Sequence, residues 1–169
     1  MPTPIRPVSL GPSDIVMERM ADGGTRLRAP TPLGAYPAKI TDRLVHFAKT
    51  APDRVLIGQR GRDGEWRTIT YGAMFDRVRR VGQALLTHGL SADRPIAILS
   101  SADLDHAVLA LAAMYVGIPF SPVSPPYSLI STDFGKLKHV LGLLTPGLIF
   151  GADGNDFAAA IAAAAPRDE

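Results

Sequence analysis

The spacing of apolar residues predicts an alternation of strands and helices from about residue 40 onward. Ile96, Ala97, Ile98 and Leu99 form an uninterrupted apolar run within residues 94–100. Such a run is typical of a strand that is buried on both faces of a parallel sheet. Other short runs rich in apolar and β-branched residues are further strand candidates. They occupy residues 55–60, 65–70, 118–123 and 148–150.

Between these runs, apolar residues recur three and four positions apart, which is the period of a helix with one buried face. Thr41, Thr70 and Ser131 are the expected N-caps of three helices, because their hydroxyls can accept free amide hydrogens. The expected helices cover residues 42–50, 71–88, 104–116, 132–144 and 156–165.

The helix at 104–116 has the clearest expected stripe and the clearest expected end. Asp103 and Asp105 lie at its start, where carboxylates favour the positive end of the helix dipole. Gly117 follows its last turn and is the expected stop. The residues expected to share its buried stripe are Leu104, Val108, Leu111 and Tyr115.

This alternation predicts an α/β fold, a three-layer sandwich whose largely parallel sheet is flanked by helices. Residues 55–60 and 65–70 add a β-hairpin closed by the turn at 61–64. Prolines and the pair Gly23-Gly24 interrupt residues 1–40 too frequently for a long helix or strand to form. Residues 14–20 can still form a short helix or strand. We therefore expect an extended N-terminal arm over residues 1–40 and one α/β subdomain over 41–169.

Composition excludes several functional classes. Eighteen Lys and Arg against sixteen Asp and Glu give a net charge of +2, and the basic residues are scattered, so we expect no nucleic-acid partner. The longest near-apolar run, residues 107–120, is too short to span a bilayer, and we expect no membrane partner. Cysteine is absent and no export signal is visible, so we expect a cytoplasmic location.

The sequence supplies no catalytic residue and no metal site that we can name. The loop at 151–155 follows a strand but lacks the Lys and Ser/Thr of a phosphate-binding loop, which favours a plain turn. The four histidines fall in different helices without paired spacing. Ser100 and Ser101 follow a strand at the carboxyl edge of the expected sheet, where they can contact a substrate or cap a helix. No motif supports a hydrolase triad.

Three segments resemble the opening of the adenylate-forming enzymes, the group that includes acyl-CoA synthetases, aryl-CoA ligases and firefly luciferase. They are Ile-Thr-Tyr at 69–71, Arg-Pro-Ile-Ala-Ile-Leu at 94–99, and the helix end, glycine, strand and prolines at 110–125. The resemblance covers roughly residues 40–165. It implies the N-terminal subdomain of the adenylate-forming fold.

Further strings resemble bacterial feruloyl-CoA synthases, at residues 33–37, 41–44, 51–54 and 122–129. The resemblance implies a ligase of phenylpropanoid degradation that converts ferulate, or a related hydroxycinnamate, first to an acyl-adenylate and then to a CoA thioester. The full-length enzyme would use ATP, Mg²⁺ and CoA.

The family's phosphate loop, adenylate motif and catalytic Lys find no counterpart in these residues. We therefore expect an N-terminal piece of a longer enzyme whose partner is the remainder of the parent polypeptide. Alone, the piece should be inactive and bind none of these cofactors. The alternative is a free-standing, non-catalytic protein-interaction domain of the same fold. A flavodoxin-like nucleotide-binding regulator is a third possibility, which the lack of a hydroxyl-rich loop disfavours.

Ser124, Pro126 and Tyr127 are the candidate cofactor-binding residues. In the family this loop lies near the CoA approach and often carries a basic residue after the proline, where Pro126 stands here. A rigid turn explains the same residues.

Overall fold

The computed structural model describes residues 11–164, and the chain divides between Ala38 and Lys39 into two compact units. The first contains one antiparallel hairpin, built from β1 (Val16–Arg19) and β2 (Thr25–Arg28). Residues 14–20, for which helix and strand were both open, thus contribute a strand. Glu18 and Arg26 face each other across the hairpin, with carboxylate and guanidinium 3.9 Å apart.

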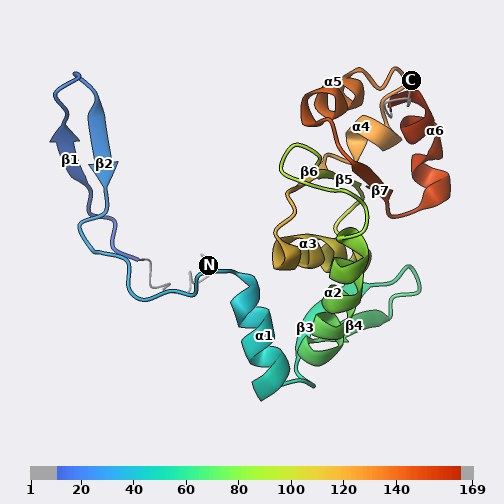
Figure 1. The fold of residues 1–169 in the computed structure, drawn as a ribbon, viewed down its shortest axis with the longest axis horizontal. Coiled ribbons are helices and arrows are strands. Elements are labelled where there is room, and N and C mark those ends of the chain that lie inside the picture. Colours follow the sequence, from blue (N-terminus) through green and yellow to red (C-terminus); the bar gives the residue numbers. More distant parts are fainter. Residues whose placement is uncertain (1–10, 165–169) are drawn as a thin grey trace, which may run out of the picture. The chain divides into compact units, whose positions relative to one another are not determined.

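The second unit contains the strands and helices that the apolar pattern predicts, together with one helix that it does not (Figure 1). In chain order its elements are α1 (Thr41–Thr50), β3 (Val55–Arg60), β4 (Trp66–Thr70), α2 (Tyr71–Leu85), β5 (Ile96–Leu99), α3 (Leu104–Val116), β6 (Phe120–Val123), α4 (Pro126–Leu129), α5 (Gly135–Leu144), β7 (Leu148–Gly151) and α6 (Gly154–Ala164).

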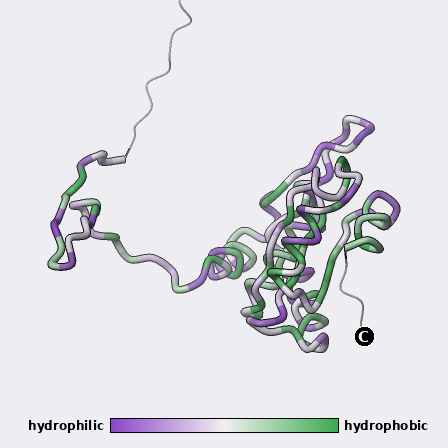
Figure 2. Tube along the Cα trace, turned by 90° about the horizontal axis from the view of Figure 1, so that it is seen from above, coloured by the Kyte–Doolittle hydropathy of each residue, from purple (hydrophilic) through white to green (hydrophobic). Residues whose placement is uncertain are grey.

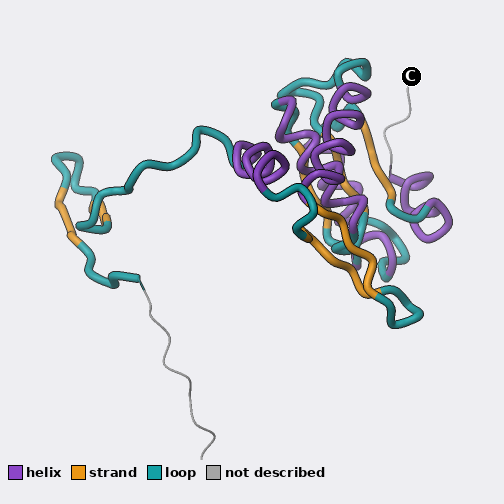
Figure 3. The backbone as a smooth tube through the Cα atoms, turned by 90° about the horizontal axis from the view of Figure 1, so that it is seen from below, coloured by secondary structure: helices purple, strands orange, loops and turns teal. Residues whose placement is uncertain are grey.

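The central sheet has the order β6-β5-β7, and β5 pairs parallel with both neighbours. All four residues of β5 are buried. Ile96 and Ile98 point into a core shared with α2 and α3, whereas Ala97 and Leu99 point into a second core shared with α5 and α6. The expected three-layer α/β sandwich is therefore confirmed (Figures 1 and 3).

The strand order explains why helices cover both faces. The chain leaves β5 through α3 to reach β6 on one side, and then returns through α5 to β7 on the other side. Crossovers of the same hand that run in opposite directions place their helices on opposite faces of the sheet. Each face thereby gains its own hydrophobic core.

The hairpin of β3 and β4 forms a separate two-stranded antiparallel sheet, as the sequence predicts. Its turn closes when the Gly61 amide donates to the Glu65 carbonyl over 2.7 Å. The turn is strongly hydrophilic and forms the purple tip visible in Figure 2. The hairpin approaches the start of α3, where the side-chain oxygen of Gln59 accepts a hydrogen bond from the Leu104 amide over 3.3 Å.

Two of the predicted helix boundaries are confirmed by capping geometry. The Thr70 hydroxyl accepts a hydrogen bond from the Ala73 amide over 3.3 Å at the start of α2. Gly117 ends α3 with a φ of 79°, a left-handed conformation that side chains disfavour.

The predicted caps at Thr41 and Ser131 are wrong. Thr41 is the first residue of α1 and is buried, and no side chain caps that helix. α5 begins only at Gly135, because Ser131 and Asp133 first fold the preceding segment into a turn. In that turn the Ser131 hydroxyl accepts from the Phe134 amide and the Asp133 carboxylate accepts from the Gly135 amide, each over 3.0 Å.

The expected stripe of α3 also needs correction. Tyr115 is 37% exposed, and the buried residues extend around the helix to Leu109, Ala112 and Ala113. The helix is apolar on most of its circumference, so apolar spacing alone does not define its buried face.

Among the described residues, none of the helices combines the length and the apolar character that crossing a membrane requires.

Candidate functional site

A crevice of about 640 Å³ lies at the carboxyl end of the central sheet, beside the tip of the β3-β4 hairpin. Ser101, which follows β5, and Asp153, which follows β7, both line it. Leu129 at the end of α4 closes part of the same space. The crevice therefore collects loops from three separate regions of the second unit.

The position of the crevice follows from the topology of the central sheet. The helix after β5 covers one face and the helix after β7 covers the other, so the two loops diverge and leave a gap between them. Ligands of open α/β sheets commonly bind at such a point. Ser101 was a sequence candidate for substrate contact, and the structure brings it next to the loop at 151–155, which the sequence favoured as a plain turn.

The lining of the crevice carries both signs of charge. The hairpin contributes the cations and one carboxylate, and the remaining carboxylates lie at the sheet edge, so a ligand with both charged and polar groups fits it better than a simple polyanion. The charged lining residues are Arg60, Arg62, Asp63, Arg67, Asp103, Asp105, Asp153 and Asp156. Over residues 11–164, no cluster of three or more histidine or carboxylate side chains has the arrangement that a metal ion needs.

Ser100 and His106 form a hydrogen-bonded pair next to the crevice. The Ser100 hydroxyl lies 2.7 Å from Nδ1 of His106, and Ser100 is only 4% exposed. The Asp103 carboxylate accepts from the backbone amide of His106 over 2.8 Å and caps α3. It is thus used by the helix end and does not orient the ring, so the pair lacks the third member of a hydrolytic triad.

Ser124, Pro126 and Tyr127 lie at and within α4, the short helix that the sequence did not predict. The Ser124 carbonyl accepts from the Tyr127 amide over 3.0 Å, and Pro126 occupies the first helical position. The ammonium of Lys136 lies 5.4 Å from the centre of the Tyr127 ring. None of the three lines the crevice, although Leu129 of the same helix does.

Sequence reasoning missed the hairpin side of the crevice. Arg60, Arg62 and Arg67 gave no signal beyond scattered surface charge, because only the packing of β3-β4 beside α3 brings them to the sheet edge. The alternation of charge around the turn at 61–64 was visible in the sequence. The sequence did not show that this turn would lie beside the edge of the central sheet.

Comparisons with known proteins give one family match and several partial similarities. The family model described as AMP-binding enzyme matches residues 44–168. Luciferin 4-monooxygenase of Luciola mingrelica is 28% identical over 82 residues, which are 48% of this chain and 14% of that protein.

Two solved structures have the same fold over most of the chain. The fatty acyl-adenylate ligase from L. pneumophila, solved with acyl adenylate and pyrophosphate, matches 69% of the chain with a TM-score of 0.61 at 16% identity. A putative long-chain-fatty-acid CoA ligase from Rhodopseudomonas palustris matches 73% with a TM-score of 0.60 at 23% identity. The matched parts cover only 20% and 29% of those two chains.

Proposed function

The chain belongs to the AMP-binding enzyme family, and we propose that it is the N-terminal part of an AMP-forming ligase that joins ferulate, or a related hydroxycinnamate, to CoA. In the proposed reaction a carboxylate oxygen attacks the α-phosphorus of ATP and releases pyrophosphate. The CoA sulfur then attacks the acyl carbon, loses its proton and displaces AMP. The observation that carries the ligase class is the family match over residues 44–168.

The choice of ferulate rests on sequence strings in the arm and from the end of β6 onward, at residues 33–37 and 122–129. The first string lies in the unit before Lys39, whereas the second begins in β6, where Val123 belongs to one of the two cores, and continues into α4. The support for a hydroxycinnamate is therefore the resemblance of these strings to bacterial feruloyl-CoA synthases.

The described residues do not fit an ATP phosphate site. The loop at 151–155, which follows β7 and opens α6, has no Lys, Ser or Thr to neutralise or bind phosphates. We therefore assign no ATP contact, and no step of catalysis, to these residues. The same reasoning leads us to propose that the chain alone is inactive.

We propose that CoA, which supplies the thiol of the thioester, approaches at α4, beside Ser124, Pro126 and Tyr127. The support is chemical: Ser124 and Pro126 are exposed, and Lys136 holds a positive charge next to the Tyr127 ring. A cation beside an exposed loop can attract a phosphate group of CoA. Lys136 would then supply the basic group that the proline string itself lacks.

The test compares the 169-residue chain with the protein encoded by its complete reading frame. Both are incubated with ATP, Mg²⁺, CoA and either ferulate or a long-chain fatty acid, and pyrophosphate release and thioester formation are followed. We expect ferulate-dependent turnover by the complete protein and none by the 169-residue chain.

Each other result has a defined meaning. Turnover by the 169-residue chain would overturn its proposed inactivity. Preference of the complete protein for the fatty acid would retain the ligase and reject the hydroxycinnamate. A reading frame that stops after Glu169 without acid-dependent pyrophosphate release would support the alternative, a non-catalytic protein-interaction domain.

A further inference from the structure

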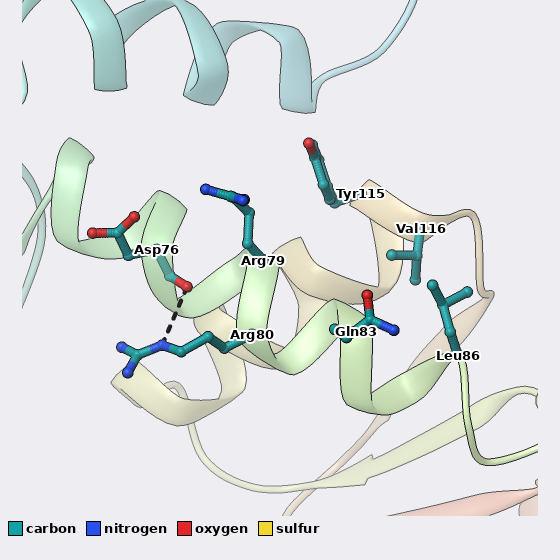
Figure 4. Close-up of a pocket in the computed structure, with 7 residues that line it drawn as sticks. All are labelled: Asp76, Arg79, Arg80, Gln83, Leu86, Tyr115 and Val116. Carbon is teal, nitrogen blue, oxygen red and sulfur yellow. Dashed lines mark hydrogen bonds between the residues drawn. The ribbon is translucent and has the colours of Figure 1, made fainter.

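A second hollow of about 740 Å³ lies away from the sheet edge, where the outer side of α2 meets the end of α3. We call it the α2-α3 groove, and it is lined by Asp76, Arg79, Arg80, Gln83, Leu86, Tyr115 and Val116 (Figure 4). We propose that this groove binds an acidic, amphipathic segment of a partner protein. The proposal goes beyond the ligase function and does not depend on it.

Arg79 lies over an aromatic ring. Its guanidinium carbon lies 5.9 Å from the centre of the Phe75 ring, and Phe75 in turn packs edge-to-face against Tyr115 with ring centres 5.7 Å apart. A guanidinium over an aromatic ring loses less freedom when it binds a carboxylate, because its position is already restricted. In Figure 4 the Arg79 and Tyr115 side chains rise on the same side of the groove.

The cations of the groove have no carboxylate partner. The only side-chain ion pair within 4.0 Å in the part of the chain that the structure describes joins Arg26 and Glu18. Arg80 uses its Nε to donate to the backbone carbonyl of Asp76 over 3.4 Å, which leaves its terminal nitrogens available. Charge complementarity therefore favours an occupant that carries carboxylates, which guanidinium groups bind in a bidentate manner.

The remainder of the lining favours a protein segment over a nucleic acid. Leu86 is 58% exposed and Tyr115 is 37% exposed, so the groove offers apolar and aromatic surface beside its cations. Asp76 stands in the same lining and would repel a run of phosphates. Arginine and tyrosine beside an exposed leucine are typical of protein interfaces, where aromatic residues and arginine are enriched.

The test measures binding of a fluorescent, acetylated peptide that carries two glutamates one helical turn apart and a leucine beside them. Saturable binding by the 169-residue chain should weaken about tenfold or more in Arg79→Gln. Arg77→Gln is the matched control, because Arg77 lies on the same helix, is exposed and does not line the groove. We expect it to leave binding within about twofold, and Leu86→Ala to weaken it several-fold.

Three outcomes would overturn the proposal. Equal losses of peptide affinity in the Arg77 and Arg79 variants would mean that the peptide is attracted by the overall positive charge of the helix and does not bind at the groove. Equal binding of a peptide with lysines in place of the glutamates, or no saturable binding at millimolar peptide, would exclude recognition of carboxylates. A DNA duplex that binds more tightly than the peptide, with the same dependence on Arg79, would assign the groove to nucleic acid. Unchanged thermal unfolding of each variant confirms that the fold is intact.

Discussion

Gly82 of α2 lies so close to Val116 of α3 that a Cβ atom built on the glycine would come within 2.9 Å of the valine Cγ1. Gly82 is buried near the C-terminal end of α2, and Val116 is the last residue of α3. The absence of a side chain at this position lets the ends of α2 and α3 approach closely beside Val116, which lines the α2-α3 groove.

Gly82→Ala should therefore destabilise the protein, although alanine favours helices. Overpacking costs about 1–3 kcal/mol, and the gain in helix propensity returns up to about 1 kcal/mol. We expect a net loss of about 1–2 kcal/mol in the free energy of unfolding, measured by urea denaturation. Val116→Ala in the same chain should recover part of this loss, and strictly additive effects of the two changes would contradict the contact.

Gly117→Ala tests the end of α3 by a different mechanism. An added Cβ would meet no atom within 4 Å, but Gly117 has a φ of 79°, which an alanine adopts at a cost of about 1–2 kcal/mol. We expect a loss of that size in the free energy of unfolding.

Gly142→Ala is the matched control for both glycine variants. Gly142 lies inside α5, its added Cβ would also meet nothing within 4 Å, and its φ lies outside the left-handed range. This change should stabilise the protein by about 0.5–1 kcal/mol. A loss of stability in Gly142→Ala would show that backbone conformation and packing do not account for the differences among the three glycine variants.

Thr70→Ala should weaken the start of α2. The Thr70 hydroxyl satisfies the Ala73 amide, and removal of such an N-cap costs about 0.5–2 kcal/mol. Thr70→Ser keeps the acceptor and should retain most of the stability in the same denaturation experiment. If serine and alanine destabilise equally, the hydroxyl contributes nothing and the methyl group of threonine is responsible.

The turn before α5 should respond to acid. The Gly135 amide, and next the Ser131 hydroxyl, donate to the Asp133 carboxylate and hold the pKa of Asp133 below its ordinary value of 3.8. A lowered pKa means that the carboxylate stabilises the turn fully above about pH 4. That contribution disappears as the pH falls through the lowered pKa.

An NMR titration of the Asp133 carboxyl carbon measures this pKa directly. In Ser131→Ala one donor is lost, so the pKa should rise toward 3.8, with the Gly135 contribution remaining. An unchanged titration curve in this variant would show that the serine does not act on the carboxylate.

Sequence alone predicted those parts of the fold in which local chemistry and burial agree. β5 is apolar on both faces and is buried on both, and Thr70 and Gly117 mark real helix boundaries. Thr41 and Ser131 failed as caps for one reason: a hydroxyl can as readily occupy the first turn of a helix or bond the backbone of a preceding turn. The sequence did not distinguish these uses.

The candidate site was less predictable, because it depends on the strand order. The loops after β5 and β7 are some fifty residues apart in sequence and meet only because β5 lies between β6 and β7. α4 was missed because its four residues are too few to show helical periodicity. Pro126 at its first position is compatible with a helix start as well as with a rigid turn.

The narrow central sheet leaves the outer sides of its two lateral strands without hydrogen-bonded neighbours among residues 11–164. Pro122 removes one amide donor from β6, whereas β7 has neither a proline nor a charged residue to discourage pairing. At high protein concentration, self-association of the chain into extended ribbons should therefore start at β7.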